Sequence, residues 1–321
     1  MKKLTLAISA IAAAFGAASA QADVSVSGSG SAAYLNDAAS ATKLNVGQFV
    51  SFSMSTTTSS GMTISGGMGL SNTITTDAGQ GVSGGQTLSF ATGGATIVVG
   101  DVEAGDTPGA VGGVVGGQIG DNGAFNSDVE DGFADDDGLG LSFSTALGAS
   151  TVAFTYVGND NVNTLGELNS STSGADAITS ASLTVPMGAY TITAGVADSD
   201  TGESSSGASV AAALGGGTLT VGYSTQTLVD GTSDATSSDL SASGDTTVMG
   251  ATYSLAMDAD TTIKVGLQNK KDADSDSTSQ FDASISRALG GGASVFLDIR
   301  SLTGDATVKG SAVAVGTSVS F

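Results

Sequence analysis

Residues 312–321 close the chain with AVAVGTSVSF, in which large apolar side chains alternate with small or polar ones. Val313, Val315 and Val319 fall on one face of an extended segment, together with Phe321. Alanine, glycine and serine fall on the opposite face. Because successive side chains of a β-strand point to opposite faces, this pattern predicts a strand with one apolar face and one face of small or polar groups.

Alternation of the same kind runs from Asp23 to the end of the chain. Val24 and Val26 alternate with Ser25 and Ser27 in the first segment, and Met62 and Ile64 repeat the pattern further on. Beyond the N-terminal segment, no apolar run approaches the roughly 20 residues that a transmembrane helix requires. The sequence therefore predicts an all-β chain.

The connections between these segments are of two kinds. Glycine and aspartate supply the positive φ that tight hairpins need, and they mark short connections at Ser59–Gly61, Gly93–Gly94, Gly148–Ala149, Pro186–Gly188, Gly215–Gly217, Asp258–Asp260 and Gly290–Gly292. Longer, polar and acidic connections span residues 36–42, 72–86, 101–138, 158–176, 198–206, 229–245, 270–279 and 303–309. Seven short turns and eight long loops predict sixteen strands.

An even number of strands, with both termini at the short-turn end, is typical of bacterial outer-membrane barrels. Hydrocarbon forces such a sheet to close, because an open edge would leave backbone groups unpaired. Aromatic residues make up only 5% of the chain, too few for a dry, close-packed core. We therefore expect a 16-stranded antiparallel transmembrane β-barrel with short periplasmic turns, long extracellular loops and a water-filled lumen.

The N-terminus carries the features of a secretory signal peptide. Two lysines precede an apolar run from Leu4 to about Ala18, and small residues follow. Cleavage sites end at Ala20 and at Ala22, and the second is preferred because Asp23 then opens a strand. We expect a signal peptide over residues 1–22 and one barrel domain over 23–321, with a retained N-terminal anchor as the alternative.

Composition excludes several classes of function. The chain has 9 Lys and Arg against 31 Asp and Glu, a net charge of −22 that disfavours binding to nucleic acid. It has no His, the commonest general base, and no Cys for disulfides or thiolate chemistry. It also lacks the G-x-S-x-G motif of serine hydrolases. We therefore do not expect an enzyme.

Three segments carry a resemblance to a known family. The final run AVAVGTSVSF, ending at Phe321, resembles the C-terminal strand of Gram-negative porins, which the barrel-assembly machinery reads. The start DVSVSGSGSAAY resembles the first strand of alphaproteobacterial porins of the Rhodobacter type. The segment TIVVGDVEAGD, Thr96–Asp106, resembles the strand that enters their long third loop. The resemblance implies a homotrimer in the outer membrane, whose third loop folds inward and narrows a passage for small hydrophilic solutes and ions.

The expected third loop, residues 101–138, is the longest in the chain and rich in acids. Loops of this length are usually functional or disordered. We expect its apolar stretch Ala110–Ile119 to pack against the inner wall while its acids project into the pore; a solvated external loop is the alternative. The acids assigned to the constriction are Asp101, Glu103, Asp106, Asp121, Asp128, Glu130 and Asp131.

Basic residues are few on the expected inner wall. Alternation assigns Lys43, Lys264, Lys270 and Arg300 to the lumen and Arg287 to the lipid-facing side. The resemblance implies basic wall residues opposite the loop acids, and here that basic set is poor. A lumen dominated by carboxylates favours cations, so we expect a cation preference.

The carboxylates Asp135, Asp136 and Asp137 stand close to Glu130 and Asp131. Hard divalent cations take oxygen ligands of this kind, so Ca²⁺ is the one cofactor that the sequence suggests. The spacing does not match an EF-hand loop. A cluster of solvated carboxylates is the alternative.

A secreted, acidic, β-rich surface protein, of the adhesin or surface-layer type, shares this composition and remains the alternative function. Such proteins lack the regular alternation of short turns and long loops and the terminal phenylalanine strand. Residence in the outer membrane and heat-modifiable migration on a gel would separate the two.

Overall fold

A computed structural model describes residues 23–37, 40–74, 79–81, 87–104, 110–111, 114, 137–158, 177–200, 202–228, 244–271, 277–304 and 310–320. The strands are β1 (Asp23–Asp37), β2 (Ser40–Thr57), β3 (Thr63–Ile74), β4 (Gly79–Gly81), β5 (Thr87–Thr92), β6 (Ala95–Glu103), β7 (Asp137–Leu147), β8 (Ser150–Val157), β9 (Ile178–Met187), β10 (Tyr190–Ser199), β11 (Ser204–Leu214), β12 (Gly217–Leu228), β13 (Gly244–Ala256), β14 (Thr261–Lys271), β15 (Ser277–Gly290), β16 (Ala293–Gly304) and β17 (Gly310–Ser320).

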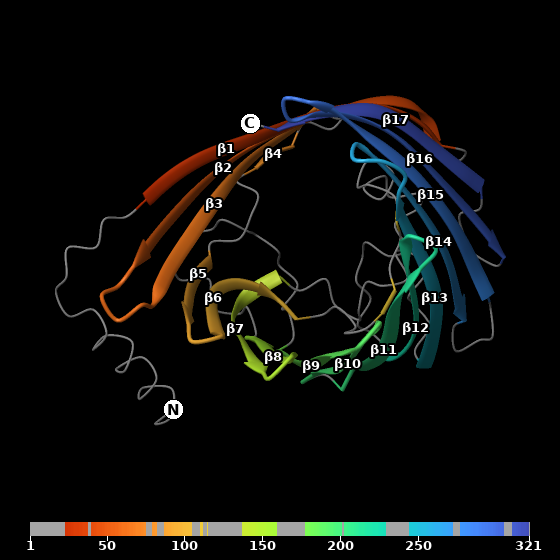
Figure 1. Ribbon diagram of the computed structural model, residues 1–321. Coiled ribbons are helices and arrows are strands. Elements are labelled where there is room, and N and C mark those ends of the chain that lie inside the picture. The colour runs from red at the N-terminus through yellow and green to blue at the C-terminus, as the bar shows by residue number, and fades with distance from the viewer. Residues whose placement is uncertain are drawn as a thin grey trace.

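These strands form one closed antiparallel barrel (Figure 1). Closure comes from β1, which pairs with β2 on one side and with β17 on the other. β4 and β5 share one position in the barrel, because β4 pairs with residues 71–73 of β3 and β5 with residues 63–67. The barrel therefore has sixteen strand positions, which confirms the expected fold class. The described residues contain no helix long and apolar enough to cross a membrane.

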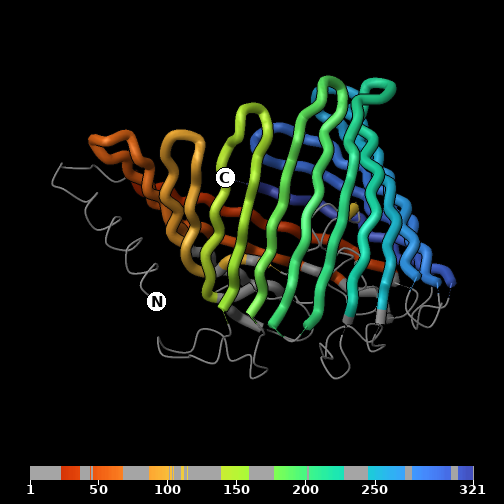
Figure 2. Tube along the Cα trace, turned by 90° about the horizontal axis from the view of Figure 1, so that it is seen from below, coloured from red at the N-terminus to blue at the C-terminus, as the bar shows by residue number. Residues whose placement is uncertain are grey.

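The seven short turns gather at one rim of the barrel (Figure 2). Gly93 and Gly94 have φ values of 55° and 85°, as a two-residue type I′ hairpin requires. The turn before β14 uses an aspartate instead: Asp258 Oδ1 accepts hydrogen bonds from the backbone amides of Asp260 at 2.8 Å and Thr261 at 2.7 Å. The amide of Asp260 is the largest cause of the lowered pKa of Asp258. All seven predicted turns are confirmed.

Several long connections are shorter than the sequence predicts. The predicted bounds of the loop 36–42 are wrong, because β1 continues to Asp37 and pairs there with Ser40, the first residue of β2. The expected loop 198–206 narrows to the few residues between Ser199 and Ser204. Serine and threonine are compatible with extended strands, so a polar stretch does not by itself end a strand.

The two faces of the wall differ as the alternation predicts. On β14, Leu267 is 57% exposed and its neighbour Gln268 only 5%. Large apolar side chains stand on the outer face around the barrel, among them the half-exposed tyrosines Tyr34, Tyr156, Tyr190 and Tyr223. An apolar outer face is what hydrocarbon requires of a transmembrane barrel.

The inner face is less uniformly polar than expected. One cluster of buried apolar residues there comprises Val102, Ala104, Val157, Ile178 and Ala197. A second comprises Leu35, Leu302, Ala312 and Ala314. Both are shielded from solvent although strand parity turns them toward the lumen. Parts of the inner wall therefore serve as packing surfaces rather than as water-contacting pore lining.

Candidate pore constriction

The segment between β6 and β7 touches the inner face of β13 and β14 at Val111, which is 4% exposed. Gln268 Nε2 donates a hydrogen bond of 2.5 Å to the Val111 carbonyl oxygen. Gly250 makes room for this approach, since a methyl group at its Cα would stand 2.8 Å from that oxygen. A larger residue at position 250 would therefore push the segment off the wall.

Three positions further along, Val114 repeats the contact on β14 and β15. Its backbone amide donates to Asp282 Oδ2 at 3.3 Å. A methyl group at Gly266 would come within 3.3 Å of a Val114 methyl carbon. Glycines on two neighbouring strands thus form a shallow seat for the two valines, with a polar partner beside each.

Asp282 is held by a buried network. Arg300 Nε lies 3.0 Å from Asp282 Oδ1 and its Nη2 lies 3.4 Å from Oδ2, and both side chains are 1% exposed. Gln280 Nε2 donates to Oδ2 at 2.9 Å. The two charged residues face each other across the β15–β16 pair. The carboxylate therefore joins two wall strands to the segment that carries Val114.

This contact lies on the far side of the barrel from where the segment begins. β6 and β7 are separated from β13–β15 by several strands in both directions around the closed sheet (Figure 1). Gly250 and Gly266 occupy central positions of their strands. A segment that leaves β6 and reaches these positions on the inner face must cross the lumen at about mid-height, and it narrows the passage there.

The bounds of the expected third loop change slightly. β6 continues to Glu103 and β7 begins at Asp137, so Asp101, Glu103 and Asp137 belong to strands. Asp101 pairs in register with Leu139, and Glu103 with Asp137. The structure does not describe the side chains of these three acids. The other acids assigned to the constriction lie entirely outside the described residues: Asp106, Asp121, Asp128, Glu130 and Asp131. The acidic constriction stays a prediction.

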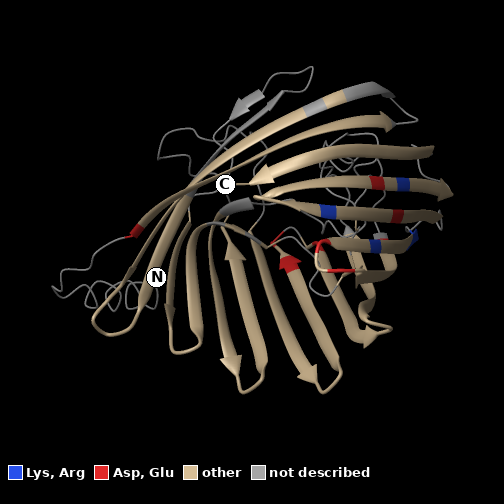
Figure 3. Cartoon of the chain, turned by 45° about the horizontal axis from the view of Figure 1, so that its top comes forward, with Lys and Arg blue, Asp and Glu red and all other residues tan. Residues whose placement is uncertain are grey.

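The basic residues assigned to the lumen differ in accessibility. Lys264 is exposed on the inner face, whereas Lys270 is 8% exposed. Arg300 lies on the inner face but is buried against Asp282, so it offers the pore no free charge. Lys43 is placed in β2 opposite Leu35, and its side chain lies outside the description. All described basic residues except Lys43 belong to β14, β15 and β16 (Figure 3).

Arg287 lies on the outer face of β15, the side to which the alternation assigned it. Its Nη1 donates to Thr261 Oγ1 at 3.4 Å, close to the short turn before β14. The calcium site and the assembly signal also stay predictions, because Asp135, Asp136 and Phe321 lie outside the described residues. Within the described residues, no three acidic side chains are grouped so that they could hold a metal ion.

The loop anchors Gln268, Gln280 and Asp282 were not foreseen. One signal was available for the ion pair. Asp282 and Arg300 stand nine residues before and nine residues after Gly291, the centre of a predicted short turn, so hairpin register places them opposite each other. Nothing in the sequence indicates that a distant loop would dock on that pair.

Filling the seat at Gly250 should loosen the loop. A Gly250→Val variant brings a side chain against the Val111 carbonyl, and overpacking of this kind costs about 1–3 kcal/mol. We expect higher open-channel current noise and a higher mean conductance in single-channel recordings. Gly47→Val is the matched control on β2, where the nearest atom is the Ser31 hydroxyl. Equal current noise in the two variants would contradict the docking of Val111 against Gly250.

Comparison with known proteins supports the architecture. A family model described as Gram-negative porin matches residues 7–307. The fold is similar to that of a porin refined at 1.8 Å, with 17% identity, a TM-score of 0.64, and coverage of 93% of this chain and 100% of that chain.

Two further solved structures align over similar lengths. An anion-selective porin from Comamonas acidovorans has 15% identity and a TM-score of 0.63, covering 94% of this chain and 100% of that chain. A mutant of the Rhodopseudomonas blastica porin has 14% identity and a TM-score of 0.63, covering 93% and 100%. At these identities the likeness concerns the fold. No curated protein is significantly similar in sequence.

Proposed function

Because the chain belongs to the Gram-negative porin family, we propose that it forms a passive, cation-preferring channel for small hydrophilic solutes and ions in the outer membrane. The observation that supports this proposal is the inner-wall seat of Val111 and Val114, which brings part of the segment between β6 and β7 to the far side of the lumen. A narrowed, water-filled passage sorts solutes by size and charge without any chemical step.

The preference for cations rests on the balance of charge along the passage. The segment between β6 and β7 is rich in Asp and Glu. On the described wall, Arg300 is neutralised by Asp282 and Lys270 is buried, while Lys264 is exposed on the inner face of β14 and is outnumbered by the acids of that segment. Carboxylates therefore dominate the charge that a permeating ion meets, and rings of acidic side chains favour cations.

Orientation, targeting and assembly follow from the same proposal. The short turns would face the periplasm and the long connections the outside, as in outer-membrane barrels generally. Residues 1–22 would serve as the export signal. Phe321 would present the last strand to the barrel-assembly machinery, and three copies would associate. Ca²⁺ at Asp135–Asp137 is a further proposal, supported by the oxygen-ligand chemistry alone.

Planar-bilayer recording across a salt gradient tests the channel and its selectivity together. The purified protein should give discrete conductance steps and a zero-current potential of the sign that cation permeation produces. A potential of the opposite sign would overturn the cation preference. The absence of any conductance, together with a soluble monomer, would favour the acidic surface-protein alternative.

Charge reversal at Lys264 should strengthen the selectivity. Lys264 is exposed on the inner face of β14, so Lys264→Glu adds two negative units to the lumen, and the zero-current potential should move further toward the cation limit. Lys271→Glu is the matched control, because Lys271 is exposed on the outer face of the same strand. Equal shifts in both variants would show that the effect is not a lumen effect.

A further inference from the structure

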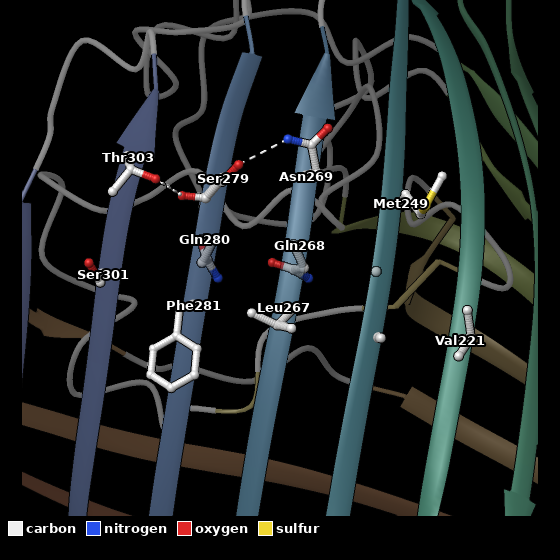
Figure 4. Close-up of a pocket in the computed structure, with 12 residues that line it drawn as sticks. Val221, Met249, Leu267, Gln268, Asn269, Ser279, Gln280, Phe281, Ser301 and Thr303 are labelled. Atoms are coloured by element: carbon white, nitrogen blue, oxygen red, sulfur yellow. Dashed lines mark hydrogen bonds between the residues drawn. The ribbon is translucent and has the colours of Figure 1, made fainter.

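A hollow of about 530 Å³ lies on the outer surface of the barrel over β12–β16 (Figure 4). Its apolar floor and walls are formed by Val221, Met249, Leu267 and Phe281. All four are between 41% and 60% exposed, although their strands belong to a continuous wall. The volume lies within the range of roughly 300–1,000 Å³ that small-molecule pockets occupy.

Strand register explains why the surface is hollow there. Val221, Ala251, Leu267, Phe281 and Ser301 stand side by side in one row across the five strands. In this row the small side chains of Ala251 and Ser301 stand on either side of the adjacent large pair Leu267 and Phe281, and both small residues line the hollow. The depression is therefore built into the row itself and does not depend on a loop.

At the end nearest the long connections, the hollow is bordered by the polar side chains of Asn269, Ser279 and Thr303, which we call the ledge. Asn269 Nδ2 donates to Ser279 Oγ at 3.0 Å and to Ser277 Oγ at 3.1 Å. Thr303 Oγ1 donates to the Ser279 carbonyl oxygen at 3.5 Å. Lys271 follows Asn269 on the outer face of β14, opposite Ser277, and is exposed.

Along β14 the outer face thus changes from Leu267 to Asn269 to Lys271 within four residues. Such a step from apolar to amide to cation marks the boundary between hydrocarbon and headgroups in a membrane protein. A lysine at this boundary attracts lipid phosphate, and it stands out on a chain of net charge −22.

We propose that this hollow binds one acyl chain of a phosphate-bearing membrane lipid, with the phosphate between Lys271 and the Asn269–Ser279 ledge. The proposal rests on the proposed function in one respect, since it requires this face to lie in a bilayer. A flexible acyl chain fits a depression only a few side chains wide. A second copy of the chain would have to bring a protrusion and a matching negative group, and would bury roughly 800 Å² on each side.

Native mass spectrometry of the full-length protein in phosphatidylglycerol nanodiscs tests the acyl-chain part. Wild type should retain one lipid after release, and Ala251→Leu with Ser301→Leu, which fills the hollow, should lower that retention at least fivefold. Ala194→Leu, on the outer face of β10, is the matched control and should retain lipid as wild type does. Equal retention in the filled variant would overturn the proposal.

Diacylglycerol, which lacks phosphate, tests the headgroup part. Wild type should retain phosphatidylglycerol several times better than diacylglycerol, and Lys271→Gln should remove that difference. A preserved difference would overturn the role of Lys271. A change of oligomeric state in the filled variant, without loss of lipid, would show that a second copy covers the hollow.

Bilayer conductance of the same variants keeps the two proposals apart. The filled variant and Lys271→Gln should conduct as wild type does, because all their changes lie on the outer face. Wild type that conducts but retains no lipid would overturn the lipid site alone. Protein that retains lipid but never conducts would overturn the proposed function alone.

Discussion

Deletion of residues 108–125 should raise the single-channel conductance about twofold or more, because it removes the segment that reaches across the lumen and leaves the open bore of a sixteen-stranded barrel. The deleted stretch contains Val111 and Val114, whose seats on Gly250 and Gly266 place the segment on the far inner wall. The barrel wall itself needs none of these residues, since its strands pair with each other all the way around.

The measurement is single-channel recording in symmetrical salt, with the zero-current potential determined on the same channels. The deletion should also weaken the cation preference, because it removes Asp121 and the contacts of Val111 and Val114 that hold the segment on the wall. Heat-modifiable gel migration serves as the control for a folded barrel. A folded deletion variant with wild-type conductance would show that the segment does not limit the passage.

The overall architecture was predictable because one period governs almost the whole chain. Alternation located the strands, and glycine or aspartate located the seven tight turns, so strand number and antiparallel pairing followed. Strand ends were predicted less well. Ser40 was predicted to lie in a loop but is the first residue of β2. Serine and threonine are equally compatible with a solvated loop and with the end of a strand at the barrel rim.

The inner face could be predicted only in part. Parity tells which residues share the lumen side, and the strand register has Lys264 and Arg300 on one face of the wall. It cannot tell which of them a returning loop covers. Arg300 was expected to present a charge to the pore and is instead 1% exposed. Hairpin register could have indicated its partner Asp282, but the segment that docks beside the pair comes from a distant part of the sequence. The sequence also did not predict that the apolar residues Leu35 and Ile178 are buried on the inner face.

Removing the Arg300 charge should produce the largest loss of stability among the wall variants. Arg300→Met leaves Asp282 as a buried carboxylate without its cation, and breaking a buried pair in this way costs about 3–5 kcal/mol. Asp298, which is 3% exposed and precedes Arg300 by two positions on the same face, adds a second negative charge to the site. The urea concentration at the midpoint of unfolding should therefore be clearly lower for Arg300→Met than for wild type.

The double variant Asp282→Leu with Arg300→Met separates the structural role from the role in the pore. Removing both charges should restore part of the lost stability, since a buried ion pair replaced by apolar groups of similar volume is often neutral. In the double variant the Val114 amide lacks its acceptor, so we expect it to show the raised conductance and noise of a loosened segment. Lys264→Met, on the same face but exposed, is the control and should change stability by about 0.5 kcal/mol at most. If the double variant were as unstable as Arg300→Met alone, uncompensated charge would not be the cause. If its conductance returned to the wild-type value, Asp282 would not be the anchor.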